Sequence, residues 1–297
     1  MLAAGFALAA LMSASTMLAG TAHAGQTFTV NNVGDPVEGD PSFGFCYANL
    51  CTLRTAITVA NSTNTRPVGN DAQLLIERDG VNAGPAATGL RIEADDVTVR
   101  GFIVQRFGDA GVSKNGDVNK VEGNYIGTDP TGRGVGAGNA EAGVSIFGGE
   151  RTTVGGNTPA ARNLISANGG AGVELFGPSL ATRANKVQNN CIGTDKFGTG
   201  ALANGFGGVF VVDSSGNTIG GGAAEANVIA FNKGDGVAFR SLNNTFADTG
   251  NAIRTNSIYS NEELGSDLHQ DDPTANDPGD LDTGENDLQN SRPSPPR

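Results

Sequence analysis

The sequence predicts an all-β protein: a right-handed parallel β-helix, which is a solenoid with three short strands in each coil. The first observation is repetition, because NYIGTD at 124–129 returns as NCIGTD at 190–195. The second is a set of Gly-Val pairs that recur along the chain, beginning at residues 111, 143, 172, 208 and 236. The third is short apolar and polar alternation within each interval, which favours strands and leaves no room for a crossover helix.

Three other folds explain these observations less well. A β-sandwich has many short strands, but it gives no reason for the same phrases to recur. A calcium-binding β-roll needs tandem G-G-x-G-x-D motifs, which the sequence does not contain. The intervals are also short for the four strands of a propeller blade.

The first segment, residues 1–24, reads as a secretion signal. Leu2 to Met12 is apolar, and Ala22-His23-Ala24 supplies a small-x-small cleavage site. We therefore expect a secreted or cell-surface protein. No later stretch is long and apolar enough to span a membrane, so we expect no span in the mature chain.

Export makes disulfides possible. Cys46 and Cys51 are predicted to close a small loop, while Cys191 is expected to be a buried, inert thiol. His269 is the one histidine that follows the predicted signal, and no C-x-x-C pair occurs. A zinc site built from His and Cys is therefore excluded.

Residues 25–65 are expected to cap the solenoid. TFTVNNVGD at 27–35 reads as a strand and turn, and CTLRTAITVAN at 51–61 as a short amphipathic helix that covers the first coil. These phrases resemble the CSLREA domain, an N-terminal module of exported bacterial proteins. The match runs through Cys51, Thr52, Leu53, Arg54, Ala56 and Ile57, while Thr55 replaces the family's Glu and removes half of a capping box.

The resemblance implies that a pectin-lyase-like β-helix follows the cap, and we assign it to residues 66–262. Phrases such as LLIERDGVNAG and NYIGTDPTG are similar to those of that group. The resemblance implies a fold and no particular reaction. Within each coil, Asn and Gly are expected at the bends, where stacked Asn side chains can hydrogen-bond along the axis.

Residues 263–297 are predicted to form an acidic C-terminal cap or linker. Ten acidic residues and no Lys or Arg lie between Glu262 and Asp287, so the net charge of −12 leaves −12 + 10 = −2 for the rest of the chain. This charge balance provides no basic surface with which to bind nucleic acid. Oxygen ligands suit calcium, which makes this segment a candidate for weak calcium binding through Asp271, Asp272, Asp277, Asp280 and Asp282.

Paired carboxylates also suggest a glycosidase, because its reaction needs two carboxyl groups at a fixed separation. The candidate catalytic residues are Asp129, Asp195, Asp271 and Asp272. A structural role is favoured for Asp129 and Asp195, since each ends the repeated phrase where a loop leaves the coil and a carboxylate can bond local backbone. They lie two repeat intervals apart, which predicts that they do not share a substrate bond.

The sequence favours an exported, non-enzymatic β-helix protein with a structural or ligand-binding role. Its expected partners are polysaccharide or cell-surface components, and no cofactor is expected beyond weakly bound calcium. The alternatives are a polysaccharide lyase or glycoside hydrolase of the pectin-lyase-like fold, and a spacer fragment of a larger surface protein. Clustered carboxylates or arginines on adjacent coils would favour an enzyme. An exposed stripe of aromatic or polar residues would favour a binding protein. The absence of both features would favour a spacer.

Overall fold

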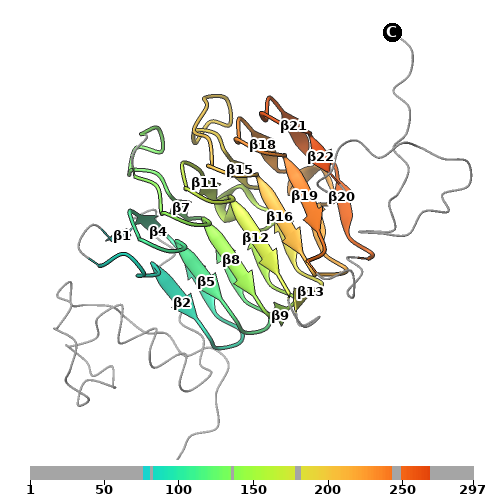
Figure 1. Ribbon diagram of the computed structural model, residues 1–297, viewed down its shortest axis with the longest axis horizontal. Coiled ribbons are helices and arrows are strands. Elements are labelled where there is room, and N and C mark those ends of the chain that lie inside the picture. Colours follow the sequence, from blue (N-terminus) through green and yellow to red (C-terminus); the bar gives the residue numbers. More distant parts are fainter. Residues whose placement is uncertain (1–75, 81–82, 135–136, 178–181, 243–248, 268–297) are drawn as a thin grey trace, which may run out of the picture.

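The computed structural model describes residues 76–80, 83–134, 137–177, 182–242 and 249–267. In this part the chain is a parallel β-helix whose coils lie side by side along one axis (Figure 1). The prediction of fold class is therefore confirmed. The predicted signal, the CSLREA-like cap, Cys46, Cys51 and the aspartates from Asp271 to Asp282 lie outside the described residues.

Three parallel sheets form the walls, and successive strands pass from one sheet to the next. The 7-stranded sheet I contains β1 (Ile76–Asp79), β4 (Phe102–Gln105), β7 (Tyr125–Ile126), β11 (Leu164–Ile165), β15 (Cys191–Ile192), β18 (Val228–Ala230) and β21 (Ser257–Tyr259). The 7-stranded sheet II contains β2 (Leu90–Ile92), β5 (Val112–Lys114), β8 (Val144–Phe147), β12 (Val173–Phe176), β16 (Val209–Val212), β19 (Val237–Arg240) and β22 (Ser266–Asp267). The 6-stranded sheet III contains β3 (Thr98–Arg100), β6 (Lys120–Glu122), β10 (Thr153–Gly155), β14 (Lys186–Gln188), β17 (Thr218–Gly220) and β20 (Ala252–Arg254).

Smaller elements decorate the bends between these sheets. A two-stranded sheet joins β9 (Gly149–Glu150) to β13 (Thr182–Arg183). Two 3-10 turns follow strands of sheet III, η2 (Pro159–Ala161) and η3 (Ala223–Glu225). Strand β22 pairs with β19 and lies beyond residue 262, so the solenoid extends into the segment expected to be cap or linker.

The repeated Gly-Val pairs mark one position in successive coils. Their valines are register partners in sheet II and are 0% exposed: Val112, Val144, Val173, Val209 and Val237. The preceding glycine is required by close packing between coils. A Cβ at Gly143 would lie 2.5 Å from Ile165 Cγ2 and 2.7 Å from the carbonyl oxygen of Gly172. The core is consequently a set of aligned Val, Ile and Leu columns.

An asparagine ladder runs along each of the three corners, as the bend positions predicted. In each ladder the side-chain amide donates to the Asn side chain of the next coil, at 2.9–3.3 Å. The first ladder holds Asn124, Asn163, Asn190, Asn227 and Asn256; the second holds Asn139, Asn168, Asn204, Asn232 and Asn261; the third holds Asn185, Asn217 and Asn251. These bonds satisfy buried polar groups that would otherwise destabilise the corners.

Candidate binding groove

Asp129 and Asp195, the two carboxylates of the repeated phrase, each cap their own loop. Asp129 Oδ1 accepts hydrogen bonds from the Thr131 hydroxyl at 2.7 Å and from the Gly134 backbone N–H at 3.1 Å. Asp195 Oδ1 accepts three backbone N–H bonds, each at 3.1 Å, from Phe197, Thr199 and Gly200. Burial works to raise the pKa of each carboxyl, but these hydrogen bonds outweigh it and lower the pKa. The carboxylates therefore shape the loops, as the repeat predicted.

The two loops also touch, although they leave coils two repeats apart. The Lys196 backbone N–H donates to the Gly132 carbonyl at 3.0 Å, and the Arg133 guanidinium lies 4.6 Å from the Phe197 ring centroid. They cover outward apolar side chains of sheet I. A Cβ at Gly132 would lie 3.1 Å from Leu164 Cδ2, and one at Gly198 would lie 3.7 Å from the sulfur of Cys191.

Cys191 is a free thiol and is buried, as predicted. Burial raises the pKa of its thiol, and the nearby Arg162 charge only partly opposes this. The thiol is therefore largely protonated and unreactive at neutral pH.

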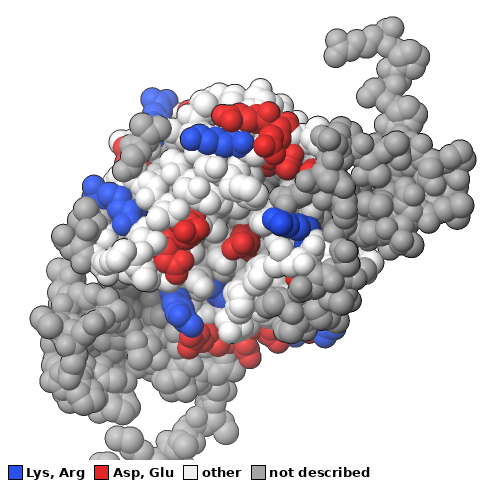
Figure 2. Space-filling model, in the orientation of Figure 1, with Lys and Arg blue, Asp and Glu red and all other residues white. Residues whose placement is uncertain are grey.

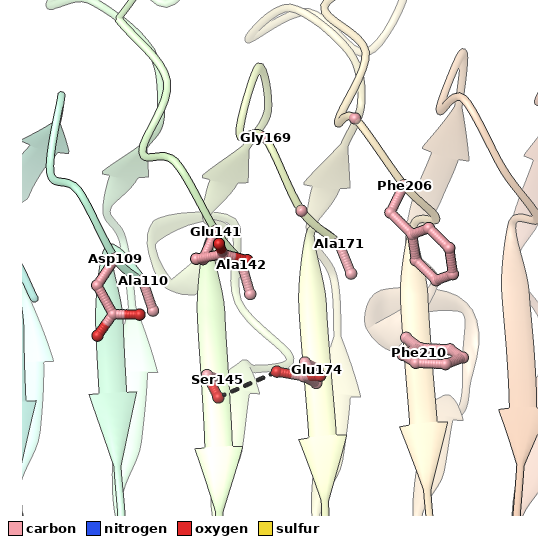
Figure 3. Close-up of a pocket in the computed structure, with 12 residues that line it drawn as sticks. Asp109, Ala110, Glu141, Ala142, Ser145, Gly169, Ala171, Glu174, Phe206 and Phe210 are labelled. Atoms are coloured by element: carbon pink, nitrogen blue, oxygen red, sulfur yellow. Dashed lines mark hydrogen bonds between the residues drawn. The ribbon is translucent and has the colours of Figure 1, made fainter. Parts of the chain in front are cut away.

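A groove opens elsewhere, on the outer face of sheet II. It has a volume of about 590 Å³, within the range of ligand sites, and crosses β5, β8, β12 and β16 where these strands begin (Figure 3). Its lining combines carboxylates, small residues and two phenyl rings: Asp109, Ala110, Glu141, Ala142, Ser145, Gly169, Gly170, Ala171, Glu174, Gly205, Phe206 and Phe210.

The repeat itself builds the groove. The position three residues before each aligned valine carries, in successive coils, Asp109, Glu141, Gly170 and Phe206. The missing side chain at Gly170 leaves an opening between Glu141 and Phe206. A Cβ there would lie 2.9 Å from the Ala142 backbone nitrogen, so the close approach of the coils excludes a larger residue. Ala110, Ala142 and Ala171 follow the first three of these residues, and their small side chains leave the groove open above the sheet.

Glu174 lies at the centre of the groove. It is half-buried, and its register partners on the neighbouring strands are Ser145 and Phe210. The Ser145 hydroxyl donates to Glu174 Oε2 at 3.3 Å (Figure 3). Burial raises the pKa of the Glu174 carboxyl; the serine opposes this, while the charges of Glu141 and Asp109 add to it.

Aromatic rings extend from the groove across the same face. Phe206 and Phe210 meet edge to face, with ring centroids 5.0 Å apart, and Phe206 is 44% exposed. One step along the strands, Phe147 and Phe176 stack with centroids 5.3 Å apart, and Phe147 is 48% exposed. Carboxylates and accessible rings thus share one surface.

The charged residues that line the groove are all acidic. None of Asp109, Glu141 and Glu174 forms an ion pair with Lys or Arg within the described ranges. Figure 2 shows acidic atoms near the middle of the face that Figure 1 presents, among uncharged residues, with Lys and Arg atoms at several other places on the same face. The described part of the chain holds no group of three or more His, Cys, Asp or Glu side chains arranged to bind a metal ion. It likewise contains no helix with the length and hydropathy needed to cross a bilayer.

Sequence reasoning missed this groove. The signal lay in the residue after each Gly-Val pair, which reads Ser113, Ser145, Glu174, Phe210 and Ala238 in successive coils. Because alternate residues of a strand face outward, that position lies on the outer face of sheet II. Residues that vary at a fixed outward position of a repeat were the available clue.

Comparisons with known proteins returned no relatives. No protein-family model matches the chain. No curated protein and no solved structure matches it either.

Proposed function

We propose that this is an exported β-helix protein that binds polysaccharide in the groove on the outer face of sheet II, without chemical conversion. The observation that carries the proposal is the placement of a carboxylate beside an aromatic ring, Glu174 next to Phe210, on register-paired strands. Carboxylate oxygens accept hydrogen bonds from sugar hydroxyls. Phenyl rings give the apolar face of a sugar ring a surface to pack on.

The shape of the groove supports a polymeric ligand. It crosses four strands, so its length is roughly 14 Å at the usual strand spacing. It is open, and the rings of Phe147 and Phe176 lie beside it, one step along the strands. A chain of sugars can therefore lie along the solenoid axis and contact several coils.

The N-terminal sequence supports the exported location. The apolar stretch Leu2 to Met12 followed by Ala22-His23-Ala24 has the form of a secretion signal. The resemblance of residues 25–65 to the CSLREA module agrees with this. A secreted or cell-surface protein would meet polysaccharides directly.

A glycoside hydrolase is the second candidate, and the environment of Glu174 favours it. A general acid needs a raised pKa, and burial together with the charge of Glu141 raises the pKa of Glu174. A lyase is less favoured because the lining contains no Lys or Arg to neutralise a uronate. A spacer would not require clustered rings and carboxylates.

The test combines binding and turnover in the same samples. The full chain is incubated with neutral, acidic and amino polysaccharides, with and without calcium, while binding, new reducing ends and unsaturated products are followed. Binding without product, lost in Phe210→Ala, supports the proposal. Product that disappears in Glu174→Gln or Glu141→Gln supports the hydrolase, and no binding to any polymer overturns both.

A further inference from the structure

We propose that the groove selects a cationic glycan, namely a polymer containing free hexosamine units, whose ammonium group lies between the Glu174 and Glu141 carboxylates. This inference rests on the proposed function and names its ligand class. It is carried by the groove, by its rings and by the uncompensated charge of its carboxylates together.

The charge argument begins with Asp109, Glu141 and Glu174. These three residues line one groove from three neighbouring strands or their entries, and none has a Lys or Arg ion-pair partner within the described part of the chain. Like charges so placed disfavour one another, and burial of Glu174 adds to the cost. An ammonium group would relieve the repulsion and form charge-assisted hydrogen bonds. A polyuronate would increase it.

The rings point to the same ligand chemistry. Phe206 and Phe210 border the groove beside Glu174, and aromatic faces attract cations through the ring quadrupole (Figure 3). Their edge-to-face arrangement leaves part of Phe206 open to solvent, since it is 44% exposed. An amino sugar offers both a cation and an apolar ring face, so it uses the carboxylates and the phenyl rings at once.

A sugar polymer fits better than a basic peptide. Extended peptides bind sheets mainly by adding a strand to a free edge. The strands under the groove have no free edge: β8 pairs with β5 and β12, and β12 pairs with β8 and β16. Recognition must therefore come from side chains, and a glycan is recognised through its ring substituents.

The test is calorimetric titration of the full chain at about pH 6, where an amine is charged and most carboxylates are ionised. The probes are a glucosamine hexamer, its N-acetylated counterpart, a galacturonate hexamer and hexalysine. We expect the glucosamine hexamer to bind at least about tenfold more tightly than the N-acetylated hexamer. We expect no binding of the galacturonate hexamer.

Two charge variants separate the groove from general acidity. Glu174→Gln keeps the shape of the side chain and should weaken binding of the glucosamine hexamer about tenfold more than it weakens binding of the N-acetylated hexamer. Glu262→Gln removes the same charge from an exposed residue outside the groove and should change neither affinity. Thermal unfolding verifies that both variants are folded.

The outcomes distinguish this inference from the proposed function. Equal affinity for the two hexosamine hexamers, with binding lost in Phe210→Ala, overturns charge selection and leaves polysaccharide binding standing. Hexalysine that binds as tightly as the glucosamine hexamer overturns the glycan in favour of a cationic peptide. Binding of no hexamer, together with no polysaccharide binding, overturns both.

Discussion

Glu174 and Phe210 occupy the same register position on neighbouring strands β12 and β16, and both side chains stand on the outer face of sheet II (Figure 3). The residues on either side of Glu174, Val173 and Leu175, are 0% exposed and belong to the core. The alternation that fills the solenoid interior therefore also fixes which side chains share the groove. Register links the stability of the fold to its binding surface.

Replacement of Thr152 by Asn is expected to stabilise the protein. Thr152 occupies the coil between Asn119 and Asn185 in the third ladder, and both Asn119 Nδ2 and Thr152 Oγ1 are buried without a hydrogen-bond partner. An Asn would accept from Asn119 and complete the ladder, adding about 1–2 kcal/mol to the free energy of unfolding. Chemical denaturation measures the change.

The matched control for this change is Thr158→Asn, at an exposed position, which should have almost no effect. A Thr152→Asn protein less stable than the parent would show that the threonine methyl group packs better than an amide can. That result would contradict the ladder as the dominant interaction at this corner.

Loss of an interior ladder residue should cost more than loss of a terminal one. Asn190 is 1% exposed; its amide donates to the Val154 carbonyl and to Asn227, both at 3.0 Å, and accepts from Asn163. Asn190→Ala should lower the free energy of unfolding by about 2–4 kcal/mol, because buried partners stay unsatisfied. Asn256→Ala should cost about 1 kcal/mol, since Asn256 is only partly buried and water can replace it. Equal losses in denaturant titrations would argue against the ladder.

Lys114 should make stability depend on pH in the alkaline range. Its side chain is 0% exposed and faces the core between Ile92 and Ile146; burial lowers its pKa to about 8, although Asp117 and Asp95 oppose the shift. Between about pH 8 and its ordinary pKa of 10.5, the unfolded state carries the proton and the folded state does not. The free energy of unfolding should therefore rise with pH across this window, by about 3 kcal/mol in total.

The variant Lys114→Met tests the same point at neutral pH. Removing a buried ammonium group should stabilise the protein by about 2–3 kcal/mol and abolish the alkaline rise. Lys120→Met, at an exposed position, serves as the control and should do neither. A loss of stability in Lys114→Met would mean that its hydrogen bond to the Gly148 carbonyl, at 3.3 Å, outweighs desolvation.

Asp195 is expected to protect Cys191 through its loop. Replacement by Ala removes the shared acceptor of the Phe197, Thr199 and Gly200 N–H groups, so the loop over the thiol should open more often. Maleimide labelling of Cys191, followed by peptide mass spectrometry, should accelerate about tenfold. Asp195→Asn keeps an acceptor oxygen and should label more slowly than Asp195→Ala. An unchanged labelling rate in Asp195→Ala would overturn the capping role.

The fold could be predicted because the residues that form each core column of a solenoid recur at a regular interval in the sequence. The Gly-Val phrases gave the strands of sheet II, and the bend asparagines gave the ladders. The contact between the loops of Asp129 and Asp195 could not be predicted, because it depends on the intervening coil turning without a long loop. The groove was missed for a related reason. Its lining residues differ from coil to coil and do not belong to a repeated sequence phrase, so only strand register brings Glu141, Glu174 and Phe206 together.

The asparagine ladders also allow the protein to change in length by whole coils. Each interior asparagine takes its partners from the coil before and the coil after, and these partners are again asparagines at the same corner. A duplicated coil inserted in register would meet the bonds it needs on both sides. The solenoid can therefore grow or shrink by whole coils while its corners stay satisfied, and every such step adds or removes one row of the outward face on which a ligand lies.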